Sequence, residues 1–157
     1  MLKRKTVFLF LVLGLAGLMP VQISEARAQP AKTKKVKVYF YHDPGEYIDL
    51  SPVMRNVSAD APARGAINAL LAGPTRQEKR RGFSALSSAN EFAIGSLKIV
   101  DGTAHINFVS SRTWHGWPGD LGPVRFRTAV ELTLKQFAGV RNVIVSLDGD
   151  PKFADES

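Results

Sequence analysis

Two periods of apolar residues alternate between residues 36 and 148, and this alternation limits the possible folds more than any other feature of the chain. Val36, Val38 and Phe40 stand at every second position, as in a strand that is buried on one face. Between residues 124 and 138 the apolar positions recur every three or four residues, as on one face of a helix. A single domain must bury both kinds of element together, which predicts an α+β fold.

A first helix is predicted between residues 60 and 73. Asp60 is expected to cap the free amides at its start, and Pro62 suits the first turn because no amide donor is needed there. Gly73 and Pro74 end the helical pattern. The apolar stripe of this helix consists of Ala63, Ala66, Ile67, Leu70 and Leu71.

A hairpin is predicted around Asp101 and Gly102. The two flanking runs, residues 93–100 and 103–109, have the composition of strands. A two-residue Asp-Gly loop between two such runs is typical of a tight hairpin turn, because both residues tolerate a positive φ.

The last helix is predicted over residues 124–138, and Gly139 stands where a helix stop belongs. Thr133 lies in the middle of its apolar face. We expect the Thr133 hydroxyl to bond back to a helix carbonyl one turn earlier, which would satisfy it while it is buried. The face consists of Phe126, Ala129, Val130, Thr133 and Phe137.

Residues 50–57 and 142–147 complete the set of predicted strands, the former interrupted by Pro52. The predicted order of elements is β-β-α-β-β-α-β. Helices with one apolar stripe and strands that partly alternate indicate two layers, with two helices packed on one face of a small mixed sheet.

The first 28 residues have the pattern of a cleaved secretory signal peptide. Lys3, Arg4 and Lys5 precede an apolar run from residue 7 to residue 19, and residues 26–28, Ala-Arg-Ala, form a cleavage pattern of small residues. Thirteen residues rise only about 20 Å as a helix, which is less than the roughly 30 Å of a bilayer core. We therefore expect export, a mature chain that begins at Gln29, and no membrane span after cleavage.

The mature chain is predicted to contain one domain. Residues 29–35 are polar and lysine-bearing and are expected to form a basic flexible linker, residues 36–150 the domain, and residues 151–157 a C-terminal tail. The 129 residues after the signal are enough to close one core without a metal or a disulfide.

Net charge and cysteine content limit which partners, anchors and cross-links are expected. Loss of residues 1–28 removes four cations and one anion, so the net charge falls from +7 to +4. A mildly basic exported domain suits anionic wall polymer, peptidoglycan or lipid headgroups, and gives little reason to expect nucleic acid. The chain has no cysteine, so we expect neither a lipoprotein anchor nor disulfides.

No set of residues predicts catalysis, a metal or a cofactor. His42, His105 and His115 are far apart in sequence and lack the spacing of metal ligands. Asp101 and Asp148 each precede a glycine, and turn geometry accounts for both without an acid–base role.

The segment from Trp114 to Asp120 is a candidate contact for a ligand or partner. Trp114, His115, Trp117 and Asp120 stand in a loop rich in glycine and proline, and aromatic rings on loops often contact sugars or partner side chains. The alternative is that one or both tryptophans plug the end of the sheet beneath the last helix.

A basic cluster follows the first helix and is a candidate contact for an anionic surface. The alternative is a solvated face without a partner. The cluster consists of Arg76, Lys79, Arg80 and Arg81.

Three groups of residues resemble the sporulation and spore-germination domain family called GerMN. Residues 70–75, Leu-Leu-Ala-Gly-Pro-Thr, resemble the end of the family's first helix. Residues 101–108 resemble its hairpin and third strand, although Asn107 stands where the family often has Asp. Thr133, Val143 and residues 148–149 resemble its closing unit. The Trp114–Asp120 loop departs from the family pattern.

The resemblance covers about 110 residues and implies a fold related to ring-building domains, outside the cytoplasmic membrane and without catalytic residues. We expect a periplasmic or wall-secreted module that binds a protein or a cell-wall component. The alternatives are a self-associating structural subunit that forms homo-oligomers through a sheet edge and, less favoured, a cell-wall hydrolase.

Overall fold

The computed structural model describes residues 32–43, 49–87, 90–117 and 119–155. All of them belong to one compact unit, residues 31–157. The predicted signal peptide and residues 29–31 of the predicted linker lie outside the described residues. None of the helices in the described ranges is long and apolar enough to cross a membrane.

The first sheet has the strand order β2-β1-β3. Strand β1 (Thr33–His42) pairs antiparallel with β2 (Asp49–Ser58) along its whole length and with the two-residue β3 (Phe83–Ser84) at its end. Because β1 begins at Thr33, the last three residues of the predicted linker are part of the sheet.

The second sheet has the strand order β4-β5-β6. Strands β4 (Phe92–Val100) and β5 (Thr103–Ser110) form an antiparallel hairpin, and β6 (Asn142–Leu147) pairs parallel to β5. The turn residues Asp101 and Gly102 have φ angles of 48° and 79°, as a tight hairpin turn requires. The predicted hairpin is confirmed.

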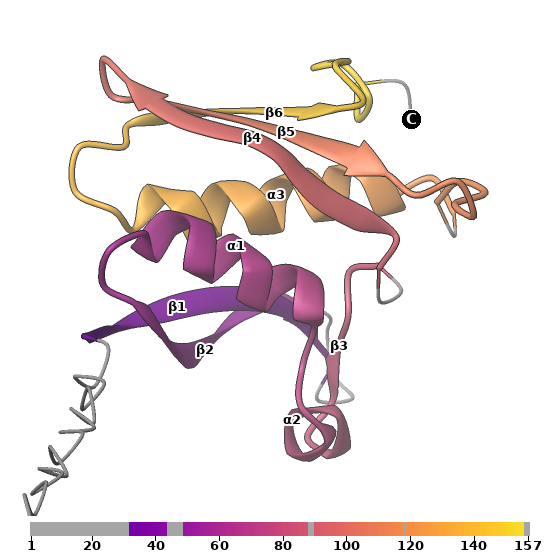
Figure 1. Ribbon diagram of the computed structural model, residues 1–157. Coiled ribbons are helices and arrows are strands. Elements are labelled where there is room, and N and C mark those ends of the chain that lie inside the picture. Colours follow the sequence, from indigo (N-terminus) through magenta and orange to yellow (C-terminus); the bar gives the residue numbers. More distant parts are fainter. Residues whose placement is uncertain (1–31, 44–48, 88–89, 118, 156–157) are drawn as a thin grey trace, which may run out of the picture. The chain divides into compact units, whose positions relative to one another are not determined.

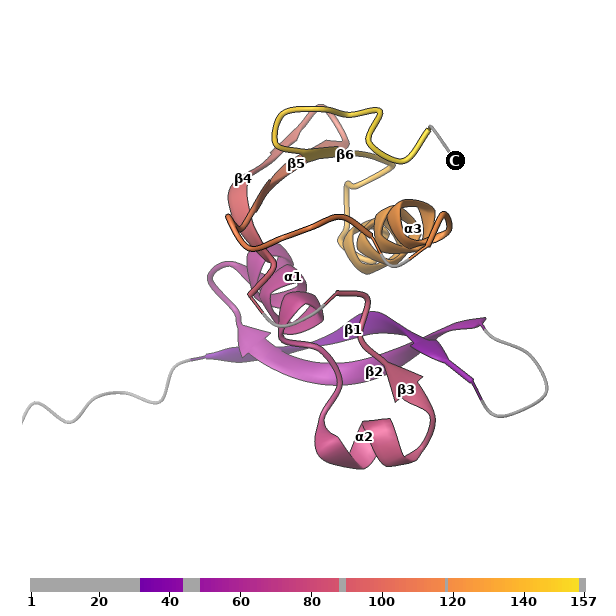
Figure 2. The same cartoon turned by 90° about the vertical axis from the view of Figure 1, so that its right-hand side faces the viewer.

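Two helices, α1 (Pro62–Ala72) and α3 (Gly122–Lys135), form a layer between the two sheets (Figures 1 and 2). Helix α1 contacts β1, β2 and β4, and α3 contacts β1 and β6. A third helix, α2 (Arg76–Arg80), is a single short turn between α1 and β3. The α+β class is confirmed, but the predicted single sheet with helices on one face is corrected to two small sheets that flank the helices.

The apolar faces explain this arrangement. On β1, Val36, Val38 and Phe40 are buried, and on β5 the buried side chains are Ala104, Ile106 and Phe108. Each sheet therefore has its own inner face. Helix α3 buries four members of the predicted stripe and also Leu134, which lies beside it, so its apolar surface is wide enough to pack against both sheets. The fifth member, Phe137, is buried just after the helix, which ends at Lys135 and not at residue 138 as predicted.

The start of α1 differs from the prediction by one residue. Its N-cap position is Ala61, which makes no side-chain hydrogen bond to the helix, and Pro62 takes the first position as predicted. Asp60 stands one residue too early to act as the cap, and its own amide donates to the Ser58 hydroxyl at 3.3 Å. Gly73, at φ 76°, ends the helix as expected.

Side chains of α3 and of the residue that follows it satisfy part of the open edge of β1. The Gln136 amide group accepts from the Lys37 N–H and donates to the Lys37 carbonyl, both at 2.7 Å. The buried Thr133 hydroxyl accepts from the Tyr39 N–H at 3.4 Å. The Thr133 hydroxyl is thus an acceptor for a strand amide, a role that helical periodicity alone could not reveal. These bonds occupy backbone groups that could otherwise pair with another strand.

Two substitutions, one on α3 and one just after it, separate packing from hydrogen bonding. We expect Thr133→Val to cost about 1 kcal/mol of unfolding free energy, since its one long hydrogen bond is lost while its shape is kept. Phe137→Ala should cost roughly 3 kcal/mol because it opens a cavity at a side chain that is only 9% exposed. Urea melts of both variants measure these costs, and a neutral Phe137→Ala would show that this face is not a core surface.

Candidate functional site

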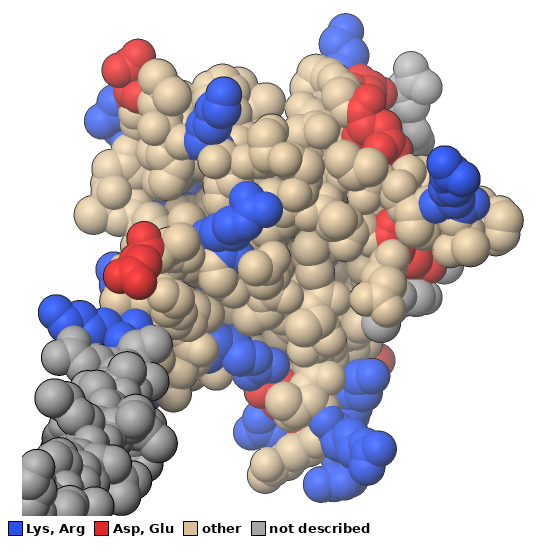
Figure 3. All heavy atoms as spheres, in the orientation of Figure 1, with Lys and Arg blue, Asp and Glu red and all other residues tan. Residues whose placement is uncertain are grey.

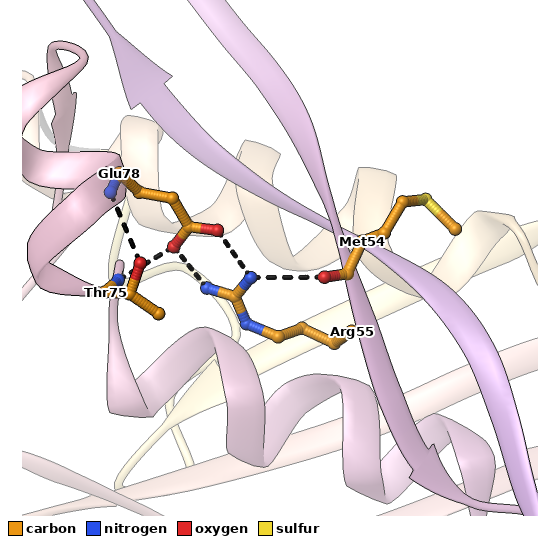
Figure 4. A network of polar contacts seen from close by, with 4 residues as sticks. All are labelled: Met54, Arg55, Thr75 and Glu78. Atoms are coloured by element: carbon orange, nitrogen blue, oxygen red, sulfur yellow. Dashed lines mark hydrogen bonds and ion pairs between the residues drawn. The ribbon is translucent and has the colours of Figure 1, made fainter.

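Helix α2 is held in place by a closed set of polar contacts. Its N-cap residue Thr75 and Glu78 form a capping box: the Glu78 N–H donates to the Thr75 hydroxyl at 3.3 Å, and the Thr75 N–H donates to the Glu78 carboxylate at 2.8 Å. Arg55 of β2 donates two hydrogen bonds to the same carboxylate, at 2.7 and 2.6 Å (Figure 4). A five-residue helix has little stability of its own, so this anchor fixes where α2 stands.

The Glu78 carboxylate is buried and charged. Its residue is 8% exposed. The hydrogen bonds from Arg55, which have the largest effect, and those from Thr75 together lower the Glu78 pKa from 4.5 to about 2, against the opposing effect of burial. The ion pair therefore persists well below neutral pH.

This depressed pKa predicts how stability depends on pH. Glu78 should contribute its full stabilisation above its unfolded pKa, near 4.5, and lose it as the pH falls towards 2. The loss should be on the order of 3 kcal/mol. Denaturant melts of the wild type and of Glu78→Gln measure it: their difference in unfolding free energy should shrink steadily between pH 5 and pH 2. A difference that does not change with pH would show that the carboxylate is not held by these bonds.

The anchor leaves the four cations of the predicted basic cluster facing solvent. All four are exposed, while the carboxylate of α2 points inward to Arg55. Figure 3 shows blue side chains gathered at the end of the molecule where α2 lies. The Arg81 guanidinium lies 5.6 Å from the Phe83 ring centroid, and the Arg81 carbonyl lies 3.0 Å from His42 Nε2. We call Arg76, Lys79, Arg80 and Arg81 the basic projection.

The tryptophans of the predicted loop pack inward. The Trp117 ring centroid lies 5.1 Å from Phe92 and 5.3 Å from Phe126, and the Trp114 centroid lies 5.4 Å from Phe92. Trp117 also packs against Gly122, where an added Cβ would lie 2.9 Å from the Trp117 Cβ. Both tryptophans are partly buried against the core. This geometry favours the plug over the partner contact.

The other two candidates in the loop, His115 and Asp120, are exposed. His115 does not join the aromatic cluster, and Asp120 lines a cleft of about 510 Å³. The structure therefore brings the two tryptophans together but does not gather the four predicted residues into one site.

The predicted C-terminal tail is largely part of the domain. Ala154 is buried, and the Phe153 ring stacks at 6.3 Å from Trp117. Arg127 of α3 forms an ion pair with Asp155 at 2.6 Å. Residues 151–155 thus pack against the aromatic cluster and α3.

Sequence reasoning missed the cleft that Asp120 lines. It lies between the end of β1 and the start of α3, with Tyr41 and Arg125 in its wall. The Arg125 guanidinium lies 4.7 Å from the Tyr41 ring centroid. Burial raises the Tyr41 pKa, and the Arg125 charge partly offsets the rise. No local motif joins two residues 84 positions apart, so only the fold could reveal the pair.

The three histidines stay apart. His42 stacks on Phe83 at 4.4 Å, His105 is exposed on β5, and His115 is exposed in its loop. Within the ranges that the structure describes, no three His, Cys, Asp or Glu side chains converge as a metal site would require.

Residues 37–153 match the Germane family, described as sporulation and spore germination. The chain belongs to this family. The match includes both sheets except the first residues of β1, all three helices, and the segment that reaches Phe153. A search of curated proteins gives no significant match.

Two solved structures have the same GerMN fold. The first holds the tandem GerMN domains of the sporulation protein GerM from Bacillus subtilis, with 20% identity, a TM-score of 0.58, and coverage of 87% of this chain and 43% of that one. The second is the first GerMN domain of that protein, with 20% identity, a TM-score of 0.56, and coverage of 75% and 85%. The chain thus spans less than half of the tandem structure. At this identity the likeness establishes the fold alone.

Proposed function

We propose that this GerMN protein is exported and acts without catalysis, as a module that binds or assembles with material of the cell envelope. The main observation behind this proposal is the basic projection. Arg55 pairs with Glu78, the carboxylate of α2. The four cations of the basic projection are therefore not paired with that carboxylate and can contact an outside partner. Four adjacent cations on an anchored turn attract an anionic surface more strongly than the same charges spread over the domain.

Family membership and the N-terminal sequence support the same function. The family is described by sporulation and spore germination, and residues 1–28 have the pattern of a secretory signal. The proposed location is the periplasm or the cell wall. The proposed partner is a protein or a wall component with negative charge.

Fractionation of the producing cells tests the location. The protein should be recovered outside the cytoplasm, and intact-mass measurement should give a chain that begins at or near Gln29. Stable recovery of an intact Met1 form in the membrane would contradict export.

A self-associating structural subunit is the second candidate. Strands β2, β4 and β6 each end a sheet, and the exposed apolar residues Val100, Val109 and Ile144 belong to the second sheet. Such surfaces can pair between copies. Sedimentation equilibrium of the purified protein separates the candidates: a binding module should remain monomeric, and a structural subunit should gain mass as its concentration rises.

A further inference from the structure

An apolar groove lies at the start of α1. This start is the end of the helix away from α2 (Figure 1). Its volume is about 510 Å³, which is within the range of small-ligand pockets. The groove is formed by the first turn of α1, by β4 and by the end of the α3 region. We call it the α1–β4 groove.

The wall of the α1–β4 groove is largely apolar. Leu97 and Ile99 of β4 and Phe137 after α3 line it, together with small residues of the first turn of α1. Phe137 is almost fully buried, but Ile99 is 47% exposed at the groove. An apolar chain seated here would remove the Ile99 side chain from water, which favours such a ligand.

Positive charge reaches the groove from two different elements. Lys34 of β1 places its ammonium 5.8 Å from the Phe137 ring centroid. Arg64 of α1 also lines the groove, and its guanidinium donates a hydrogen bond of 3.5 Å to the Ile94 carbonyl. Both cations therefore retain donors for a ligand.

The first turn of α1 adds to this positive potential. It contains no acidic residue, and its N-cap makes no side-chain hydrogen bond, so its free amides are not satisfied by a carboxylate of the helix itself. Neither Asp nor Glu is among the described residues that line the groove, and Asp60, the nearest acid in sequence, is not part of its wall.

We propose that the α1–β4 groove binds a small amphiphilic anion, an alkyl chain that carries one carboxylate or phosphate head group. The chain would lie on Leu97, Ile99 and Phe137, and the anionic head would accept hydrogen bonds from Lys34 and Arg64. An uncharged alkyl ligand would leave these two cations unused, and a cationic one would be repelled by them. This site is separate from the basic projection and goes beyond the proposed envelope contact.

Calorimetric titration of the full chain, as the expressing cell processes it, tests the proposal with four eight-carbon probes. Octanoate should bind at least about tenfold more tightly than octanol, and octylammonium should bind more weakly than both. Octyl phosphate should bind at least as tightly as octanoate: tighter binding would identify phosphate as the preferred head group, and equal binding would show that the groove accepts either. NMR shift changes on octanoate addition should centre on Leu97, Ile99 and Ala63.

Variants then test the cationic part and the apolar part of the groove separately. Lys34→Met with Arg64→Met should abolish the preference for octanoate over octanol but keep octanol binding. Ile99→Glu should weaken octanoate and octanol binding by about tenfold or more. Lys98→Met is the matched control, because Lys98 is an exposed neighbour of both apolar residues on β4 and does not line the groove; it should bind all probes as the wild type does.

Thermal melts first establish that each variant is folded. Equal binding of octanoate and octylammonium, an unchanged preference in the Lys34/Arg64 variant, or shift changes centred on Trp114 and Trp117 would each overturn the proposal. So would a peptide with a free carboxylate at a C-terminal leucine, if it bound tenfold more tightly than octanoate, because the occupant would then be a polypeptide end.

Discussion

Trp117→Ala is expected to lower the free energy of unfolding by roughly 3 to 5 kcal/mol. The Trp117 ring lies within 5.3 Å of both Phe92 and Phe126, measured between centroids, and Phe92 and Phe126 are buried. Removing the indole opens a cavity between the end of the second sheet and α3, and it also uncovers the Phe153 ring that stacks on it. Chemical denaturation at neutral pH measures the loss directly.

His115→Ala is the control for this substitution, because His115 lies in the same loop and is exposed. We expect its effect to stay within about 0.5 kcal/mol. Trp114→Ala, with fewer ring contacts, should fall between the two. If Trp117→Ala melted like the wild type, the rings would not be part of the core, and the loop would again be a candidate partner contact.

Arg55→Met should cost about 3 to 5 kcal/mol, the second large effect. The substitution leaves the Glu78 carboxylate buried with neither of the two hydrogen bonds that hold it at 2.7 and 2.6 Å. Because the carboxylate also completes the capping box with Thr75, α2 should lose its fixed position. Denaturant melts measure the cost, and proteolysis within residues 76–81 should become faster.

Two further variants test the cause. The double variant Arg55→Met with Glu78→Leu should recover much of the loss, because an apolar pair leaves no unpaired buried charge. Lys135→Met removes one partner of the exposed pair with Glu131 and should cost no more than about 0.5 kcal/mol. A double variant as unstable as Arg55→Met alone would mean that the anchor depends on packing and not on charge.

Local patterns predicted most of the elements correctly. The Asp101-Gly102 hairpin, the apolar face of α3 and the stop at Gly73 depend on residues close together in sequence, so periodicity and turn chemistry were sufficient to find them. The order of the five longer strands and two longer helices was predicted for the same reason. The GerMN resemblance was also carried by short local motifs, and the family match confirms it.

Long-range pairings could not be predicted in this way. Periodicity shows that a strand has one buried face but not which helix covers it, so one sheet was expected where there are two. Arg55 and Glu78 lie 23 residues apart, and nothing near either residue in the sequence indicates the ion pair. The sequence alone allows two interpretations of the tryptophan loop, because its contacts with Phe92 and Phe126 depend on the tertiary fold.

The candidate site could likewise be predicted from the sequence only in part. Sequence alone identified the basic projection, because its four cations are clustered within six residues. It could not show that the carboxylate among them is turned inward. The α1–β4 groove was not predicted at all, since it is assembled from β1, α1, β4 and the end of the α3 region.

Co-sedimentation with purified cell-envelope fragments tests most directly whether the basic projection is the binding surface. The bound fraction of the wild type should be high at low salt and fall as ionic strength rises. Replacing Arg76, Lys79, Arg80 and Arg81 with glutamine should weaken binding at least about tenfold. A control with the same loss of charge, in which Lys35, Lys37, Lys98 and Arg112 become glutamine, should stay within about twofold of the wild type. Equal losses in the two variants, or no loss in the first, would contradict the account.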